Sequence, residues 1–280
     1  MTVHDLAPST HPASHGRRIG EHLCRVLANE AVNADYRLMR LAAPAGACAA
    51  RPGQFFHMLC PAEAGGTPFL RRPMSIYDAT PERGEIAFLY KVHGAGTRAL
   101  ATLAPGAAMD VVGPLGRGFT LESGWRRLLL LGRGVGLATL APLADAAADK
   151  GIAITAILSV RRPDLVMSVE RLESVGATVH VVHDGDGSSH VDSVARLIED
   201  RLAAQPVDAV FTCGSARLLV LLQGLAARYG LFGEVALEQQ MACGLSMCFC
   251  CVRAFKVGDR VEHRRVCWEG PVFDLQEALP

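Results

Sequence analysis

Five of the nine cysteines in this 280-residue chain lie within its last 38 residues, at spacings that suit metal ligation. Four residues separate Cys243 from Cys248, two separate Cys248 from Cys251, and fifteen separate Cys251 from Cys267. The first three have the spacing of plant-type [2Fe–2S] ligands. A hairpin over Phe255–Cys267 would return the fourth thiolate to them. We therefore predict that Cys243, Cys248, Cys251 and Cys267 hold a [2Fe–2S] cluster.

Two alternatives stay open for this cysteine segment. Zinc is also bound by four cysteines, although structural zinc sites favour cysteines in close pairs and Cys267 has no near neighbour of its type. Cys250 is adjacent to Cys251 and could replace it as a ligand, but the two-residue spacing favours Cys251. A disulfide framework is disfavoured, because a chain of this length buries a sufficient core without one.

A glycine-rich turn over Gly132–Gly136 follows a run of four leucines and precedes a helical stretch. Glycines permit a tight turn, and the N-terminus of the following helix offers backbone N–H groups to a pyrophosphate. Gly132, Gly134 and Gly136 are therefore candidate ligands of a dinucleotide. The pattern lacks the full G-x-G-x-x-G spacing, so a tight turn without a ligand is the alternative.

The end of the next expected strand, residues 152–160, bears on which dinucleotide binds. Arg161 and Arg162 stand there, in place of the acidic residue that holds a ribose 2′-hydroxyl. Arginines at this position can accommodate the 2′-phosphate of NADP, and they can equally be a solvated strand end. The choice between NAD and NADP stays open.

Two segments nearer the N-terminus are further candidates for phosphate binding. Arg72 and Ser75 would face opposite sides of a strand unless Pro73 bends it. Gly96 and Thr97 follow another expected strand in a glycine turn, where Thr97 is a candidate N-cap of a helix. Either segment alone is better explained as a surface arginine or an ordinary turn.

These residues lie on two different patterns of elements. Short β-rich runs bounded by turn signals, such as Gly53–Cys60 and Glu85–Val92, predict a small antiparallel barrel or sandwich. From Arg126 onward, buried strands alternate with helices, which predicts a parallel sheet covered on both faces. Gly113–Gly118 reads as a loop at the junction. We expect a flexible lead-in (1–16), a β-barrel domain (17–121), a parallel-sheet domain (122–238) and the cysteine segment (239–280).

Composition excludes several classes of protein. Lys plus Arg and Asp plus Glu each total 28, so the formal net charge is zero and no basic excess favours nucleic acids. The longest apolar stretches have 11 and 10 residues, well short of the about 20 that a membrane-spanning helix needs. The N-terminus lacks the features of a secretion signal. We expect a cytoplasmic protein with no membrane or nucleic-acid partner.

Taken together, these segments resemble the iron–sulfur, FAD-containing electron transfer subunit of NAD-dependent dihydroorotate dehydrogenase, within the ferredoxin-reductase superfamily. The resemblance extends from about Gly20 to Leu275 and is most specific in the cysteine segment. The segments that carry it are Arg72–Ile76, Gly94–Thr97, Gly113–Gly116, Gly132–Gly136, Cys213-Gly214, Met241–Cys251 and Cys267–Phe273.

The resemblance implies a multi-domain β plus α/β fold: an antiparallel β-barrel FAD domain, a parallel-sheet nicotinamide domain and a C-terminal [2Fe–2S] segment. It implies that Arg72 meets the FAD pyrophosphate and Ser75 the flavin ring, and that Cys213 and Gly214 lie near the nicotinamide. The cofactor-binding residues it implies are Arg72, Pro73, Ser75, Gly96, Thr97, Gly132, Gly134, Gly136, Cys213 and Gly214, the iron ligands are Cys243, Cys248, Cys251 and Cys267, and no catalytic residue is assigned.

The implied function is a relay of electrons between NAD(H), FAD, the cluster and a partner flavoprotein that oxidises dihydroorotate in pyrimidine biosynthesis. No site for an organic substrate is evident on this chain, so a hetero-oligomer is expected. A reductase for another partner, a flavin reductase that has lost its cluster, and a zinc-stabilised binding module are the alternatives. Arg133 and Ser215 replace the family's usual Gly and Pro, which bears on dinucleotide specificity and on the partner.

Overall fold

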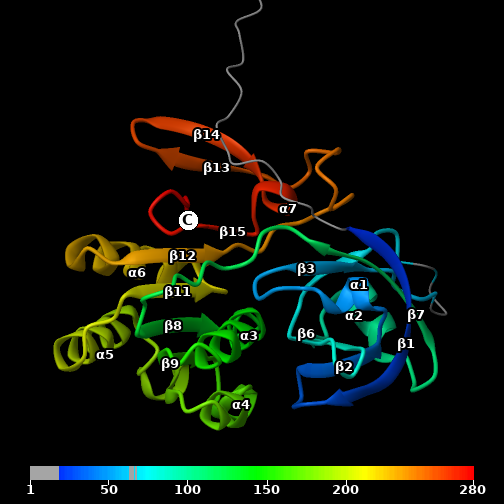
Figure 1. Cartoon of the computed structure of the whole chain (residues 1–280), viewed down its shortest axis with the longest axis horizontal. Helices are drawn as coiled ribbons and strands as arrows, with labels where there is room; N and C mark the ends of the chain where they lie inside the picture. Colours follow the sequence, from blue (N-terminus) through cyan, green and yellow to red (C-terminus); the bar gives the residue numbers. More distant parts are fainter. Residues whose placement is uncertain (1–18, 63–65, 67) are drawn as a thin grey trace, which may run out of the picture.

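The computed structural model describes residues 19–62, 66 and 68–280, which form two large sheets side by side and a smaller hairpin (Figure 1). The predicted lead-in over residues 1–16 lies outside the described residues. An open barrel contains the N-terminal candidate residues, and a parallel sheet contains the glycine turn. The arrangement agrees with the fold class expected from the sequence.

The N-terminal sheet is antiparallel and curls around a buried core that includes Met39, Phe56 and Phe88. Its two edge strands are consecutive in the chain and are joined by Ile76 and Tyr77, so the sheet forms an open barrel. In spatial order the strands are β4 (Arg72–Ser75), β3 (Phe55–Met58), β7 (Ala108–Leu115), β1 (Gly20–Ala31), β2 (Tyr36–Ala42), β6 (Glu85–Lys91) and β5 (Asp78–Thr80), with helices α1 (Ala45–Cys48) and α2 (Gly94–Ala101).

The expected loop over Gly113–Gly118 is wrong for its first half, because β7 continues to Leu115. Gly113 is the last residue of β7 that pairs with β1, so the N–H that Pro114 lacks is not needed for that ladder. Leu115 instead pairs with Phe55 of β3. Beyond the strand, the N–H of Arg117 donates to the Gly270 carbonyl at 2.6 Å, which fixes the junction to the cysteine segment.

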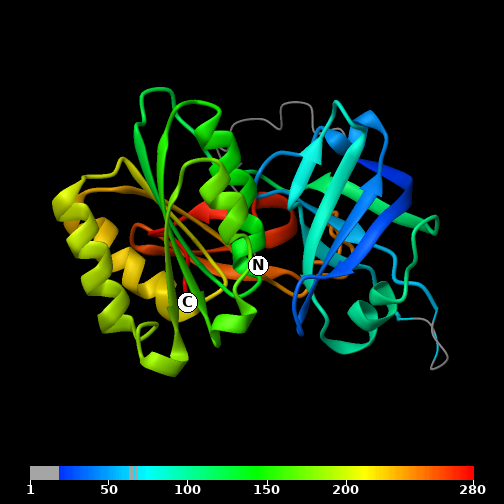
Figure 2. The same cartoon turned by 90° about the horizontal axis from the view of Figure 1, so that it is seen from below.

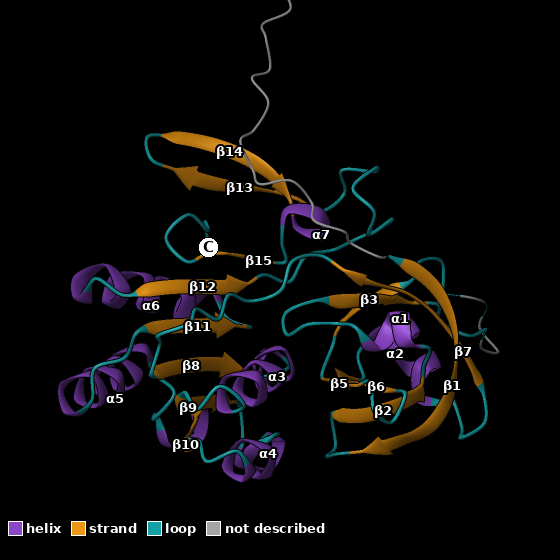
Figure 3. Cartoon of the chain, viewed as in Figure 1, coloured by secondary structure: helices purple, strands orange, loops and turns teal. Residues whose placement is uncertain are grey.

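The second sheet has five parallel strands and one antiparallel edge strand, and helices cover both of its faces (Figure 3). Its central strands are apolar because both of their faces are buried. In spatial order the strands are β10 (Thr178–His183), β9 (Ala153–Val160), β8 (Arg127–Arg133), β11 (Ala209–Cys213), β12 (Phe232–Ala236) and β15 (Val272–Asp274); α3 (Gly136–Ala148) and α4 (Val169–Ser174) cover one face, α5 (Val191–Ala204) and α6 (Ala216–Tyr229) the other, and Pro163–Leu165 and Asp184–Asp186 are single 3₁₀ turns.

The cysteine segment is fastened to this second sheet. The predicted hairpin is present as β13 (Val252–Val257) and β14 (Arg260–Arg265), and the short helix α7 (Val266–Glu269) carries Cys267. Strand β15 then pairs antiparallel with β12, so the segment ends inside the parallel-sheet domain. The hairpin and α7 lie beyond the β12 edge of the second sheet (Figure 1), so from below their red and orange ribbon is seen behind the sheets, at the middle of the view (Figure 2).

The barrel and the parallel-sheet domain share one apolar core at their seam. Tyr36 and Leu89 of the barrel pack in the same buried cluster as Leu137 of α3. Polar contacts fix the seam further: the Tyr77 hydroxyl lies 3.1 Å from the Ser168 hydroxyl, and Arg171 Nη1 donates to the Tyr77 carbonyl at 2.8 Å. The domains therefore hold a fixed orientation around the space between them.

Candidate functional site

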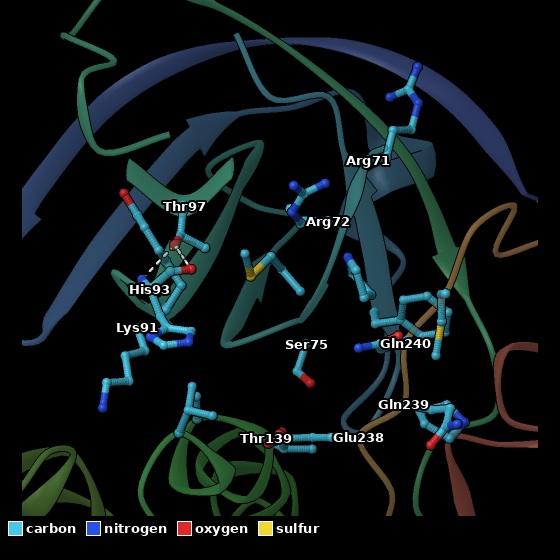
Figure 4. Close-up of a pocket in the computed structure, with 18 of the residues that line it drawn as sticks. Arg71, Arg72, Ser75, Lys91, His93, Thr97, Thr139, Glu238, Gln239 and Gln240 are labelled. Carbon is cyan, nitrogen blue, oxygen red and sulfur yellow. Dashed lines mark hydrogen bonds between the residues drawn. The ribbon is translucent and has the colours of Figure 1, made fainter. Parts of the chain in front are cut away.

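A cavity of about 1070 Å³ opens at this seam, and the cysteine segment closes part of it (Figure 4). Its size is at the upper end of the range for pockets that enclose drug-sized ligands. Basic and hydroxyl side chains lie on the barrel side, and the rest of the lining mixes apolar side chains with a few polar ones, Glu238 among them. The lining residues include Phe55, Arg72, Pro73, Met74, Ser75, Leu89, Lys91, His93, Thr97, Val135, Thr139, Leu237, Glu238, Met241 and Cys250.

Arg72 lies against the first turn of α2. A Cβ added at Gly96 would fall 2.5 Å from Arg72 Nε, so only glycine lets the guanidinium lie this close to the helix backbone. The arginine also donates to the Leu70 carbonyl. A cation beside a helix N-terminus attracts anions such as a pyrophosphate. The structure thus brings Arg72 and Gly96 into contact, and it places Pro73, Ser75 and Thr97 on the same cavity.

The expectation that Thr97 caps this helix is wrong, because α2 begins three residues earlier, at Gly94. Thr97 is inside the helix, and its hydroxyl accepts from the His93 N–H and donates to the His93 carbonyl, both at 2.6 Å (Figure 4). The hydroxyl therefore closes the first turn from within. Its contribution to the site is to hold the strand-to-helix turn above the cavity.

On the other side of the seam, two βα turns interlock through glycines. A Cβ at Gly136 would fall 2.4 Å from the Cys213 carbonyl oxygen, and a Cβ at Gly214 would fall 2.1 Å from the Arg133 carbonyl oxygen. Gly214 also has a φ of +93°, which side chains rarely adopt. The structure therefore brings together the turn at residues 132–136 and the Cys213-Gly214 turn, although neither Gly132 nor Gly214 lines the cavity itself.

Cys213 lies at the end of β11 and is buried. Burial raises the pKa of its thiol well above the ordinary range, so the sulfur stays protonated at neutral pH. A hydrogen bond joins it to Thr139, which faces the cavity. Cys213 therefore does not line the cavity itself but contacts Thr139, which does.

Arg133 points along the carboxyl edge of the parallel sheet. Its Nη1 donates to the Ser159 hydroxyl at 2.7 Å, and its Nη2 donates to both carboxylate oxygens of Asp184, at 3.0 and 2.8 Å. These hydrogen bonds, with one from Ser189, lower the pKa of Asp184 to about 2. Arg133 is therefore anchored to a carboxylate two strands along the edge, after β10, which sequence reasoning missed because the partner follows a different strand.

Glu238 is a second residue that sequence reasoning missed. Its carboxyl is open to the cavity and enclosed by protein on its other sides, and this desolvation raises its pKa. In the view of Figure 4, Glu238 is drawn beside Thr139 and below Ser75, and all three line the cavity. The signal in the sequence is a single carboxylate between an apolar strand end and the first cysteine of the cluster motif.

The cysteine loop between residues 243 and 251 curls through left-handed conformations. Gly244 has a φ of +67°, Ser246 of +74° and Phe249 of +57°, and two of the three non-glycine residues with positive φ in the described part of the chain are in this loop. Such residues cost energy and cluster at functional sites. Backbone N–H groups point at sulfur here: the N–H of Leu245 donates to Cys243 Sγ at 3.3 Å.

The four predicted ligands lie in two pairs. Cys248 is hydrogen bonded to Cys243, and backbone hydrogen bonds from Cys243 and Cys250 lower its pKa to about 7. Cys267 is hydrogen bonded to Cys251, and burial raises its pKa to about 12. Within the described residues, no three His, Cys, Asp or Glu side chains are grouped as around one metal ion.

The neighbouring Cys250 points elsewhere. It is exposed, its sulfur lies 3.8 Å from the Gln240 carbonyl oxygen, and it lines the cavity. Cys251 is buried, and its sulfur accepts from the Cys267 N–H at 3.4 Å.

His57 of β3 is the third residue that sequence reasoning missed. It is 1% exposed, and neither of its ring nitrogens has a hydrogen-bond partner. Burial lowers its pKa to about 4, so it is neutral at pH 7. The signal in the sequence is a single histidine in the otherwise apolar run Phe55–Cys60.

The residues present suit the groups predicted from the sequence. The cavity combines a cation at a helix N-terminus with apolar walls, which suits a flavin dinucleotide. Four sulfur atoms in two adjoining pairs suit a two-iron cluster. Among the described helices, none is both long and apolar enough to cross a membrane.

Two family models match parts of the chain. Residues 23–119 match the oxidoreductase FAD-binding domain, and residues 238–278 match the iron–sulfur cluster binding domain of dihydroorotate dehydrogenase B. The chain therefore carries an FAD-binding domain and an iron–sulfur domain of known kinds.

Whole-chain comparisons agree. The chain is 33% identical over 234 residues to the dihydroorotate dehydrogenase B (NAD(+)) electron transfer subunit of Shouchella clausii, a match that covers 82% of this chain and 86% of that protein. The same subunit of Bacillus caldolyticus is 34% identical over 232 residues, with 82% and 87% covered. Among solved structures, a chain of an NADH-dependent reduced ferredoxin–NADP oxidoreductase superposes with a TM-score of 0.76 at 29% identity, covering 91% of this chain and 89% of that one.

Proposed function

Because the chain belongs to the family of electron transfer subunits of NAD-dependent dihydroorotate dehydrogenase B, we propose that it relays electrons between a catalytic flavoprotein partner and NAD(H). The observation that carries the proposal is the shared cavity: Met241 and Cys250 of the cysteine segment line the same space as Arg72 and Ser75 of the barrel. The two redox groups would therefore be close neighbours.

The barrel side of the cavity is the proposed FAD site. Arg72 and the N-terminus of α2 hold the pyrophosphate, while the Thr97 hydroxyl keeps that turn closed. Pro73 and Ser75 border the ring, and apolar side chains such as Leu89 keep water away from it. When bound, FAD can take up two electrons together and pass them on singly, which joins a hydride donor or acceptor to a one-electron cluster.

The cysteine pairs are the proposed ligands of a [2Fe–2S] cluster. Cys243 and Cys248 would bind one iron, and Cys251 and Cys267 the other, as the observed pairing suggests. The left-handed loop turns its N–H groups toward sulfur, and such hydrogen bonds stabilise the more negative, reduced state of a cluster.

The carboxyl edge of the parallel sheet is the proposed dinucleotide site. The turn that contains Gly132, Gly134 and Gly136 would bind the pyrophosphate with backbone N–H groups, and Cys213 and Gly214 would border the nicotinamide. Arg133 is already paired with Asp184, which supports NAD over NADP because the positive charge is not available to a 2′-phosphate.

The proposal divides the chain into an FAD domain (17–121), a nicotinamide domain (122–238) and a cluster segment (239–280). It also places the protein in the cytoplasm.

A second candidate is a reductase subunit for a different partner. The observation that favours it is the similarity to the chain of the NADH-dependent reduced ferredoxin–NADP oxidoreductase, which extends over 91% of this chain. Arg133 and Ser215, where the family usually has Gly and Pro, point the same way.

The test is co-purification with the native partner, followed by assays of the loaded complex. Reduction of NAD⁺ that depends on dihydroorotate supports the first candidate, and a complex that is inactive with dihydroorotate supports the second. Cys251→Ser should remove iron and partner-dependent turnover but leave NADH-dependent dye reduction, which needs only the flavin. Cys24→Ala, a buried thiol of the barrel core, is the matched control that retains iron.

Cys250→Ser separates the two neighbouring thiols. If Cys251 is the ligand, Cys250→Ser retains iron and sulfide, whereas loss of iron would assign Cys250 instead. A colourless protein that binds zinc and contains no labile sulfide would contradict the relay altogether.

A further inference from the structure

His57 is a polar side chain sealed between the barrel and the cysteine loop. It is 1% exposed, and both of its ring nitrogens lack a hydrogen-bond partner. Buried polar groups in folded proteins are nearly always paired, so an unpaired imidazole requires an explanation. Since a neutral imidazole carries one N–H donor and one acceptor, at least one donor is left without a protein acceptor.

The ring edge of His57 faces the backbone of the cysteine loop. A Cβ built on Gly244 would fall 2.8 Å from His57 Nε2 and 3.0 Å from Cδ2. Gly244 directly follows Cys243, and its φ of +67° also favours glycine. The backbone of the loop at Gly244 therefore packs directly against the imidazole, and a side chain at this position would push the loop and the ring apart.

The same strand reaches the cavity. Phe55, two residues before His57, lines the cavity, and the two ring centroids are 5.8 Å apart. Residues two apart on a strand share a face. His57 therefore stands between the proposed flavin site and the proposed cluster, in a space from which water is excluded.

We propose that His57 tunes the cluster by donating its Nε2–H to a sulfur of the group held by the cysteine loop. This inference rests on the proposed function, because it needs the cluster to be bound. A hydrogen bond to sulfur stabilises the reduced cluster more than the oxidised one, and in a dry environment the effect is strong. His57 thereby raises the potential of the cluster and favours electron transfer to it.

The experiment uses the fully loaded protein and variants of this one position. His57→Leu removes the donor, and His57→Gln keeps an N–H on a side chain of similar reach. In an EPR-monitored redox titration, we expect His57→Leu to lower the ratio of reduced to oxidised cluster at least tenfold at a given potential, which is 59 mV for one electron. His57→Gln should recover most of that ratio.

Met58→Leu is the matched control, because Met58 is the next residue of the strand and is fully buried but has no N–H to donate. Its cluster should titrate as in the wild type. The inference is overturned if the His57→Leu cluster titrates at the wild-type potential while iron and sulfide are fully present. Equal shifts of the potential in His57→Leu and His57→Gln would also overturn it, because they would indicate an effect of packing alone.

A measurement on the unmodified protein covers the case in which the leucine variant does not load. Pulsed EPR of the reduced, ¹⁵N-histidine-labelled wild type should detect a coupled histidine nitrogen that disappears in His57→Gln. Absence of that coupling in a protein with a normal cluster signal overturns the role of His57 only. Absence of iron and sulfide from anaerobically purified protein overturns the proposed function instead.

Discussion

Two turns of this protein face the places proposed for phosphate groups, and they use arginine in opposite ways. At the Arg72 turn, formed by Arg72 and the first residues of α2, the guanidinium lies on the helix N-terminus and donates to a backbone carbonyl. At the Arg133 turn, formed by residues 132–136 and Gly214, the guanidinium is directed away and donates to the Asp184 carboxylate.

The difference between the two arginines matches the time for which each proposed ligand, FAD or the nicotinamide dinucleotide, must stay bound. A full positive charge beside a helix N-terminus suits a cofactor that remains bound through many turnovers. A neutralised arginine leaves the backbone N–H groups to bind the phosphates, which suits a dinucleotide that must leave after each reaction. In the proposed sites, similar glycine turns would thus give tight or exchangeable binding according to the partner of one arginine.

The largest effect is expected from a substitution that disrupts the backbone packing of the Arg133 turn. Gly214→Ala should destabilise the protein by about 3 kcal/mol, because its Cβ meets the Arg133 carbonyl and its φ is positive. Gly176→Ala is the matched control, with a φ of +79° and open space around the added atom, and should cost only about 1 kcal/mol. Denaturant unfolding measures both, and equal costs would mean that the interlocked turns contribute nothing.

The next test removes the charge of the Arg72 turn. Arg72→Gln should weaken FAD binding about 30-fold, or about 2 kcal/mol, because a charge-assisted contact to the pyrophosphate is lost. Flavin fluorescence on dilution measures the release. Arg98→Gln, on the exposed side of the same helix, should retain FAD as the wild type does. If Arg72→Gln binds FAD with unchanged affinity, the charge of Arg72 does not contribute to pyrophosphate binding, and the comparison of the two turns fails.

A smaller effect is expected when Arg133 is released. Asp184→Ala frees the guanidinium to meet a 2′-phosphate, so the ratio of kcat/KM for NADPH to that for NADH should rise about 3- to 10-fold, or about 1 kcal/mol. Asp186→Ala, in the same turn but paired with Ser188 and His183, is the control. A ratio that stays constant would show that Arg133 does not reach the adenosine end.

The smallest effect concerns pH. The pKa of Asp184 is lowered to about 2, so its stabilising pair with Arg133 is complete above the ordinary carboxyl pKa and is lost only as pH falls toward 2. The difference in thermal midpoint between wild type and Asp184→Asn should therefore be constant from pH 5 to pH 8. A difference that shrinks within this interval would mean that the pair is weaker than its geometry indicates.

Much of the fold could be predicted because it depends on local patterns. The run Leu128–Leu131 is buried on both faces and forms the expected strand β8. The cysteine spacing favours Cys251 over Cys250 as a ligand, and in the structure Cys251 is buried whereas Cys250 is exposed. The strand end at Gly113–Leu115 was missed, because Gly and Pro signal a loop locally while pairing with Phe55 extends the strand.

The missed site residues depend on contacts between distant parts of the chain. His57 meets Gly244 across 187 positions of sequence, and Arg133 meets Asp184 from another strand. No periodicity or spacing in one sequence records such a meeting. The glycines at 136 and 214 were recognised as turns, but their mutual packing became evident only from the fold.

Strand β15 has a consequence for biosynthesis. It closes the exposed edge of β12, yet it follows all the cysteines in the sequence. On the ribosome, the parallel-sheet domain must therefore wait with an uncovered edge until β15, which comes after residues 243–267, has been synthesised. Synthesis of the cysteine segment and completion of the neighbouring sheet are thus linked in time, and a chain that ends before β15 would be prone to edge-to-edge association.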